Sequence, residues 1–491
     1  MSGSLLKILF FDDSIEHAHV NAILDASMEA LAENSNRTFT YAELKFFAMW
    51  WDLQTNATHE LVNELVQSGQ LDFVNGGWCM HDEAATHFIG MIDQTTLGHA
   101  FLKDKLGFIP KVGWQIDPFG HSSTQASYMT SLMGFDSLYF GRLDYQDLTL
   151  RLATRECEGL WDASPNVGSP VFWGLTGSYS GNYHEPPGGF CFDILCEDDP
   201  LVGWDDAVLL QRITAYVEQL VVQSKRTKGN HIMVTMGGDF QVSFFWVSHR
   251  DVPNSLRLTY SIQYQEAKIN FQNLDLLIHS IFRFQESGQL DIPAMFGDSY
   301  KKIAIFYSNP DYYTEMKYEQ TKKIHRSMSK QVWSTKTDDF FPYANDAHAY
   351  WTGYFTSRAG LKRLERVASS FLMAARQIAS FPVPHFGRME LNDCDEALFD
   401  LADAVGVVEH HDALSGTSKQ HVADDYAKSV QAGINKAQAF AAKKMKSLLL
   451  APDDVDSYLT NLAYCQLLNE TTCDVTEVRH QKGQAQSKLS F

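Results

Sequence analysis

The sequence predicts an α/β protein in which a parallel β/α barrel-like domain is followed by a helical bundle. Over residues 14–307, short apolar strands alternate with amphipathic helices, and this alternation is typical of βαβ units around a parallel sheet or barrel. Beyond Thr352 the pattern changes to long helical segments. Aspartates directly follow two of the apolar strands, at the edge where parallel α/β folds place their chemistry.

The elements of the N-terminal part are predicted from hydrophobic spacing and turn residues. The predicted helices cover residues 14–34, 58–68, 84–105, 122–133, 205–223 and 271–285, and a helical turn begins at 46–53. The predicted strands cover residues 38–44, 71–74, 112–116, 137–140, 231–236 and 304–307. Residues 167–200 are rich in glycine and aromatic residues and are predicted to form a loop that walls or covers a site.

The C-terminal part is predicted to be helical, with helices over 359–381, 395–407 and 423–450. Consecutive helices of this kind predict a bundle. The predicted domains are therefore an α/β catalytic domain over 1–335, a helical bundle over 336–450 that carries His410-His411-Asp412, and a truncated tail over 451–491.

The charge of the chain excludes some classes of partner. It has 60 acidic and 40 basic residues and a net charge of -20, which argues against nucleic acid or an anionic membrane as a partner. The sequence also has no apolar segment long enough for a membrane span. An acidic chain fits an acidic compartment, where protonation of carboxylates relieves their mutual repulsion.

Cysteines and glycosylation sequons indicate the secretory pathway. Two close cysteine pairs lack CxxC spacing: Cys191 with Cys196, and Cys465 with Cys473. Short disulfide loops are therefore favoured over zinc knuckles. Three Asn-x-Thr sequons begin at Asn36, Asn56 and Asn469. The residues after Met1 lack the apolar run of a signal peptide, so we expect the beginning of the protein to be missing from this chain.

Asp117 lies at the C-terminal end of the predicted strand 112–116, because Pro118 and Gly120 end that strand. A carboxylate there, followed by a proline without an N–H and by an aromatic residue, suits a nucleophile or a metal ligand. The alternative is that Asp117 caps the helix that follows.

Asp117 also belongs to one of seven sequence blocks: GGW at 76–78, DEAATH at 82–87, DPFGHS at 117–122, FGRLDYQ at 140–146, MGGDFQ at 236–241, YWTGYF at 350–355 and HHDALSGTS at 410–418. In this order the blocks resemble the family-38 glycoside hydrolases, most closely their lysosomal α-mannosidase branch. The resemblance implies a retaining α-mannosidase that releases terminal α-D-mannose from N-glycan oligosaccharides, in the lysosome or the secretory pathway.

By this resemblance Asp117 is the catalytic nucleophile and Asp239 is the general acid and base. Glycoside hydrolysis needs two carboxyl groups on either side of the scissile bond, one ionised and one protonated. Without the resemblance, the residues around Asp239 favour a different role, in which Asp239 caps a helix after Gly237-Gly238.

The resemblance also implies a zinc ion, Zn²⁺, ligated by Asp117 and His411, with Asp412 as a contact of the sugar hydroxyls. Imidazole and carboxylate groups suit zinc. A lone His-His pair, however, is more often a surface or packing feature.

Phe119, Arg142 and Trp351 are predicted by the same resemblance to bind the substrate. Aromatic faces stack on the apolar face of a pyranose, and arginine holds hydroxyls or a carboxylate. The neighbouring Tyr350 is interpreted as structural.

The chain departs from the family pattern in two ways. The family's opening His-x-Asp strand, which supplies two zinc ligands, and its β-rich C-terminal half are both absent, so we expect a partial chain with an incomplete zinc site. Residues 242–263 interrupt the pattern directly after Gln241. They form either a substrate lid or, as we favour, an aberrant insertion translated from an unspliced intron.

Two other functions stay open at this point. One is a catalytically impaired glycan-binding remnant of the same family, and the other is a zinc amidohydrolase or deacetylase on a similar barrel. The latter needs a histidine-rich ligand set, and only His411 lies in a suitable place. The expected partner is a mannose-containing oligosaccharide, and assembly into a homo-oligomer is left open.

Overall fold

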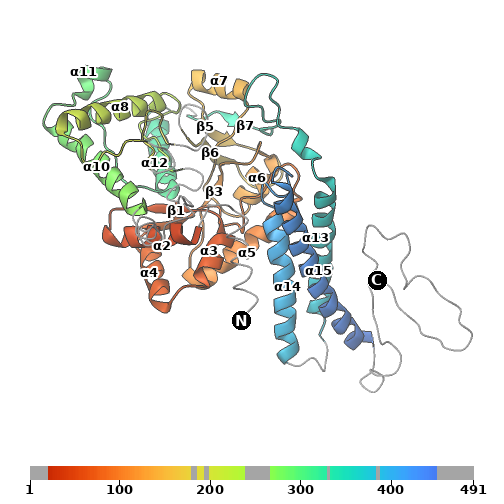
Figure 1. The fold of residues 1–491 in the computed structure, drawn as a ribbon. Helices are drawn as coiled ribbons and strands as arrows, with labels where there is room; N and C mark the ends of the chain where they lie inside the picture. Colours follow the sequence, from red (N-terminus) through yellow and green to blue (C-terminus); the bar gives the residue numbers. More distant parts are fainter. Residues whose placement is uncertain are drawn as a thin grey trace, which may run out of the picture. The chain divides into compact units, whose positions relative to one another are not determined.

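The computed structural model describes residues 20–177, 185–192, 198–237, 266–328, 332–382 and 388–449. The chain divides into two compact units, Met1–Phe355 and Thr356–Phe491. All the described strands belong to the first unit, where Figure 1 shows them among helices. The second unit carries the long helices α13, Ala359–Ser380, α14, Arg388–Val408, and α15, Gln420–Leu449.

A five-stranded sheet forms the centre of the first unit. Its strands lie in the order β3, Val112–Gln115, β4, Ser137–Phe140, β6, Val171–Leu175, β5, Glu158–Trp161, and β7, Thr335–Lys336. β3, β4 and β6 are parallel, whereas β5 runs antiparallel to β6 and parallel to β7. A parallel pair, β1, Phe39–Tyr41, and β2, Leu71–Phe73, makes a second sheet.

The two sheets approach each other where β2 ends. The Asn75 N–H donates to the Val112 carbonyl at 2.7 Å, so the chain after β2 lies against β3. In the described part of the chain, strand pairing does not close these sheets into a barrel. The α/β class is therefore confirmed, but the predicted barrel is not.

The core beneath the sheet is aromatic. Phe140 of β4 stacks on Trp173 of β6 with centroids 5.4 Å apart and planes at 14°, and Phe340 packs edge-on against Trp161 at 4.8 Å. All four rings are buried. Because each ring removes a large apolar area from water, this cluster fixes the strands whose ends carry the site.

Most helices of the first unit follow the predicted hydrophobic periods, and three of them, described below, were not predicted. They are α2, Val20–Glu33, α3, Leu44–Trp51, α4, Asn56–Gln67, α5, Phe88–Leu106, α6, Ser123–Ala126, the π-helical turn η1, Ser127–Ser131, α7, Tyr145–Thr154, α8, Asp206–Ser224, α10, Glu266–Glu286, α11, Ile292–Phe296, and α12, Pro310–Met328. The helix predicted over 122–133 is divided between α6 and η1. Helices α8 and α10 share a core that includes Ile213, Leu220 and Ile281.

The strands predicted at 231–236 and 304–307 are wrong, because neither segment pairs with a strand. Their apolar residues pack against the α8–α10 core instead. Glutamine side chains bind their backbone groups. Gln285 donates to the Ile303 carbonyl and accepts from the Ile303 N–H, both at 2.9 Å, and Gln223 donates to the Met233 carbonyl at 2.7 Å.

Several elements were not predicted from the sequence. β6 lies inside the stretch predicted as a loop, where glycines on both sides obscure five residues of strand. β5, β7, α7, α11 and α12 were also missed. α12 is mostly polar and is held by a buried ion pair, Lys317 Nζ to Glu158 Oε2 of β5 at 2.7 Å, so hydrophobic periodicity could not find it.

In the described part of the second unit, three helices pack around an apolar core. Its buried residues come from all three helices and include Phe371, Leu401 and Ile434. A Cβ at Gly433 of α15 would lie 2.9 Å from Leu401 Cα of α14, so this glycine permits the close approach of the two helices. The helical bundle expected after the α/β part is therefore confirmed in part, by three helices within the described residues.

Candidate active site

Asp117 and Arg142 meet at the edge of the five-stranded sheet. Asp117 follows β3 and Arg142 follows β4, and because these strands are neighbours and parallel, their ends lie side by side. The Arg142 Nε donates to the Asp117 carbonyl and to its Oδ1, both at 2.8 Å, and Nη2 completes an ion pair with Oδ1. Both side chains are only about one fifth exposed, at 19% and 18%, so the pair is largely shielded from water.

Three aromatic rings surround this ion pair. The Arg142 guanidinium carbon lies 5.3 Å from the Phe119 ring centroid, 5.1 Å from that of Trp351 and 5.9 Å from that of Tyr343. Such distances are those of cation–π contacts. The Phe119 and Trp351 rings are themselves 4.9 Å apart. The structure thus brings together all four residues predicted for this part of the site: Asp117, Phe119, Arg142 and Trp351.

The charge of Arg142 is secured by its surroundings. Burial lowers the pKa of Arg142, but the charge of Asp117 and hydrogen bonds with Tyr343 and Asp117 outweigh burial, so the pKa is raised. Arg142 therefore stays a cation at every pH at which the protein is folded. It can hold a carboxylate or sugar hydroxyls throughout a reaction.

Sequence reasoning missed three residues that support this site. Tyr343 contacts Arg142, and Tyr354 donates from its hydroxyl to the Phe119 carbonyl at 3.1 Å. Glu83 is buried and binds the segment that carries Asp117. The blocks at 82–87 and 350–355 contain Glu83 and Tyr354, so the resemblance pointed to these segments without giving the residues a role.

The second unit carries the predicted His-His-Asp motif directly after α14. One ligand atom from each of His410, His411 and Asp412 lies within 4.8 Å of the others. His411 is buried, and Asp412 is fixed by the Thr417 hydroxyl, which donates to Oδ1 at 2.6 Å. Two imidazoles and a carboxylate form a donor set that suits zinc, so these residues fit the metal that the resemblance implies.

Some predicted residues lie outside the described part of the chain. They are the acid/base candidate Asp239, the interrupting segment 242–263, the tail over 451–491, and the cysteines Cys196, Cys465 and Cys473. Cys191 is disulfide-bonded, whereas Cys79 and Cys157 are buried and form no disulfide. None of the described helices is long and apolar enough to cross a membrane.

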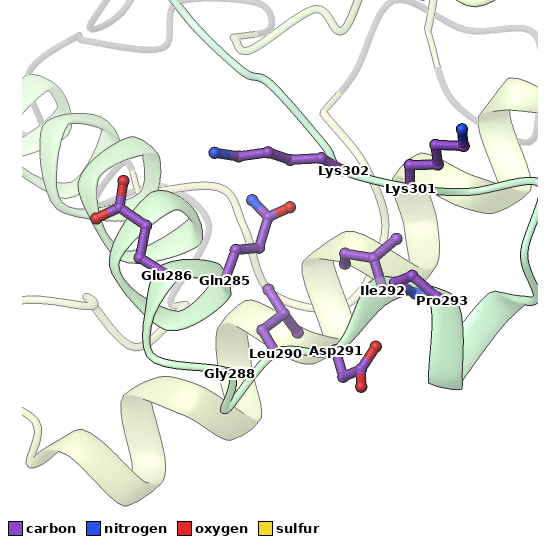
Figure 2. Close-up of a pocket in the computed structure, with 9 residues that line it drawn as sticks. All are labelled: Gln285, Glu286, Gly288, Leu290, Asp291, Ile292, Pro293, Lys301 and Lys302. Carbon is purple, nitrogen blue, oxygen red and sulfur yellow. The ribbon is translucent and has the colours of Figure 1, made fainter.

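The first unit has a hollow of about 200 Å³ (Figure 2). It is lined by the end of α10, the start of α11, and Lys301 and Lys302. Figure 2 shows the two lysine side chains pointing in opposite directions, with Glu286 and Asp291 also on the rim. Mixed and divergent charges do not form an anion site, and none of the predicted site residues lines this hollow.

A carboxylate at a strand end, held by an arginine and framed by aromatic faces, is an arrangement on an α/β scaffold that suits binding and processing of a carbohydrate. Comparison with known families specifies the class further. The glycosyl hydrolases family 38 N-terminal domain matches residues 10–346, and the alpha mannosidase middle domain matches residues 349–448. The chain belongs to glycosyl hydrolase family 38, which confirms the resemblance seen in the sequence.

Individual relatives agree with this assignment. An alpha-mannosidase of Arabidopsis thaliana is 38% identical over 483 residues, which are 96% of this chain and 42% of the relative. The human lysosomal alpha-mannosidase is 37% identical over 470 residues, covering 95% of this chain and 41% of the relative. The chain thus spans about two fifths of the length of the curated relatives it matches.

A solved structure supports the fold. The crystal structure of an alpha-mannosidase from Enterococcus faecalis aligns with a TM-score of 0.54 at 15% identity and covers 88% of this chain and 40% of that one. At this identity the likeness concerns the fold alone.

Proposed function

We propose that this chain carries the catalytic part of an α-mannosidase that removes terminal α-D-mannose from N-glycan oligosaccharides with retention of configuration. The observation that carries the proposal is the Asp117–Arg142 pair framed by Phe119 and Trp351. The alpha-mannosidase names of relatives aligned over more than nine tenths of the chain support it.

In the proposed reaction, Asp117 is the nucleophile. Its carboxylate attacks the anomeric carbon and forms a glycosyl ester while the bond to the leaving oxygen breaks. Asp239, assigned from the sequence, donates a proton to that oxygen and then removes a proton from the water that hydrolyses the ester. Arg142 orients the Asp117 carboxylate before attack and stabilises its charge when it leaves in the second step.

The aromatic residues provide the sugar-binding surface in this proposal. The Phe119 and Trp351 rings are tilted by 52° to each other, so they offer two faces of different direction to a pyranose ring. The Trp351 Nε1 donates to Asn345 Oδ1 at 2.8 Å, which fixes the orientation of the indole. Mannose would therefore meet a preformed surface and lose little binding energy to side-chain ordering.

Zinc is the expected metal of this protein. The resemblance assigns Asp117 and His411 as its ligands and Asp412 to the sugar hydroxyls. When bound, zinc would hold two hydroxyls of the sugar and assist distortion of the ring.

The acidic composition and the sequons support a lysosomal or secretory location. The human relative is named a lysosomal alpha-mannosidase, which is consistent with this location.

The test of this proposal is release of p-nitrophenol from an aryl α-mannoside at mildly acidic pH, with and without added zinc. We expect turnover that is lost in the Asp117→Asn variant. Binding of a mannose disaccharide without turnover would instead support the glycan-binding remnant. Acetate release from an N-acetylated sugar that Asp117→Asn does not affect would support the deacetylase.

A further inference from the structure

Glu83 forms a buried hydrogen-bonding centre beneath the segment that carries Asp117. Its side chain is fully buried. Oε1 accepts from His121 Nδ1 at 2.8 Å and from Gln115 Nε2 at 3.2 Å, and Oε2 accepts from the Ser122 N–H at 2.7 Å. Because a carboxylate opposite Nδ1 can only accept, His121 carries its proton on that nitrogen.

The three donors bracket one short loop. Gln115 is the last residue of β3, whereas His121 and Ser122 immediately precede α6. Residues 116–120 between them contain Asp117 and Phe119. One carboxylate therefore binds both ends of the loop that carries the proposed nucleophile.

A second layer of hydrogen bonds fixes the segment before Glu83. Gln94 Nε2 donates to His81 Nδ1 at 2.7 Å, and His81 Nε2 donates to Gln125 Oε1 at 2.7 Å. The Gln94 amide is itself oriented by the Cys79 N–H, which donates to its Oε1 at 3.0 Å. The His81 carbonyl accepts from Gln115 Nε2 at 3.0 Å. Glu83 thus starts from a rigid segment and has little freedom to follow a shift of the loop.

We propose that Glu83 is the positioning residue of this site, because it binds both ends of the 116–120 loop and thereby fixes the place of the Asp117 carboxylate. The kinetic part of this inference rests on the proposed function. Its structural part, the hold on the loop, does not.

The Glu83→Gln variant tests this with almost no change in shape. The new amide nitrogen is a donor, so it faces another donor in either orientation: the Ser122 N–H, or the Gln115 and His121 side chains. The Ser122 backbone N–H cannot become an acceptor. The loop therefore shifts. Since a displacement of about 1 Å can cost about 100-fold in rate, we expect kcat to fall about 100-fold.

KM should change much less than kcat. Phe119 has contacts besides those that Glu83 makes with the ends of the loop, because its carbonyl accepts from the Tyr354 hydroxyl and its ring packs on Trp351. The matched control is Leu220→Ala, which removes core packing from α8. It should lower the melting temperature while kcat stays unchanged, so a general loss of stability would be recognised.

Hydrogen exchange supplies a readout that does not depend on activity. In the full chain, Glu83→Gln should accelerate exchange in a peptide covering residues 113–122, and Leu220→Ala should not.

If Glu83→Gln does not fold, the variants His121→Asn and His121→Leu test the same contact. Asn retains a donor at the Nδ1 position, and His121 Nε2 has no hydrogen-bond partner among the described residues. His121→Asn should therefore keep the kcat of the unaltered chain and its slow hydrogen exchange over residues 113–122. His121→Leu should have a lower kcat and faster exchange.

The outcomes separate the two proposals. If the unaltered chain is inactive and Glu83→Gln still loosens residues 113–122, the proposed function fails and the hold on the loop stands. If the chain is active and Glu83→Gln has an unchanged kcat and unchanged exchange, the positioning role is overturned. The positioning role is also overturned if Leu220→Ala loses as much kcat as Glu83→Gln, or if the two His121 variants lose kcat equally.

Discussion

At the scale of single residues, the chemistry of the site is concentrated in Asp117. Its carboxylate is paired with Arg142 through Oδ1 and lies between two strand ends. Asp144, which follows Arg142 by two residues, has a different task, because it caps α7 by accepting from the Gln146 and Asp147 N–H groups at 2.9 and 3.2 Å. The two aspartates are therefore a matched pair for experiment.

We expect a mechanism-based fluoro-mannosyl reagent to label Asp117. The fluorine slows hydrolysis of the glycosyl ester, so the ester accumulates on the nucleophile. Peptide mass spectrometry would locate the label. Asp144→Asn should be labelled as fully as the unaltered chain, and a label on Asp144 or Asp239 would overturn the assignment.

Asp72 of β2 gives the fold a pH dependence. Burial, and secondarily the charge of Asp311, raise the pKa of Asp72 to about 6, although the Phe73 N–H and Lys111 act in the opposite direction. The folded state therefore binds a proton more tightly than the unfolded chain. The resulting stability is fully present below about pH 4 and is lost as the pH rises through about 6.

The Asp72→Asn variant should remove this dependence. At pH 7.5 we expect its free energy of unfolding to exceed that of the unaltered chain by up to about 3 kcal/mol, and at pH 4 we expect the two to be equal. Urea titrations at the two pH values measure the difference. A constant offset at both values would mean that the substitution acts through packing.

At the scale of elements, glutamine side chains take the place of strand partners. Gln285 of α10 binds both backbone groups of Ile303, and Gln223 of α8 binds the carbonyl of Met233. The extended segments at 231–237 and 301–309 are in this way attached to helices instead of a sheet.

The Gln285→Ala variant should therefore detach the segment around Ile303. Two hydrogen bonds of about 1 kcal/mol each are lost, so we expect the free energy of unfolding to fall by about 2 kcal/mol. Exchange of the Ile303 amide should also become faster. Gln289→Ala is the control, because Gln289 is exposed in the following turn, and its effect should be within about 0.5 kcal/mol. Slow exchange of Ile303 in Gln285→Ala would contradict this role.

These segments also show what the sequence could and could not predict. The apolar residues in 231–236 and 304–307 pack against a core, but the predicted strands are absent because periodicity cannot tell whether a strand or a glutamine binds the backbone. α12 was missed for the opposite reason, since Lys317 attaches it through charge. The amphipathic helices α4, α8 and α13 were predicted well because their burial is apolar and regularly spaced.

At the scale of the whole molecule, the site could be predicted only in part. Asp117 and Arg142 follow neighbouring strands, and a strand end can be read from local sequence. Trp351 was placed by resemblance alone, because its contact with Phe119 joins segments far apart in the chain. Glu83 was not assigned a role, since its importance arises from donors at both ends of another loop.

The distance along the chain between the parts of the site affects how it is made. The Tyr354 hydroxyl binds the Phe119 carbonyl across 235 residues. At a translation rate of about 5–20 residues per second, roughly 10–50 s pass between the synthesis of these two residues. During that interval β3, β4 and the Glu83 contacts can form on the ribosome, but Phe119 still lacks its partners Trp351 and Tyr354. Until residue 354 has emerged, Phe119 of the nascent chain therefore lacks the aromatic contacts that cover it in the folded protein.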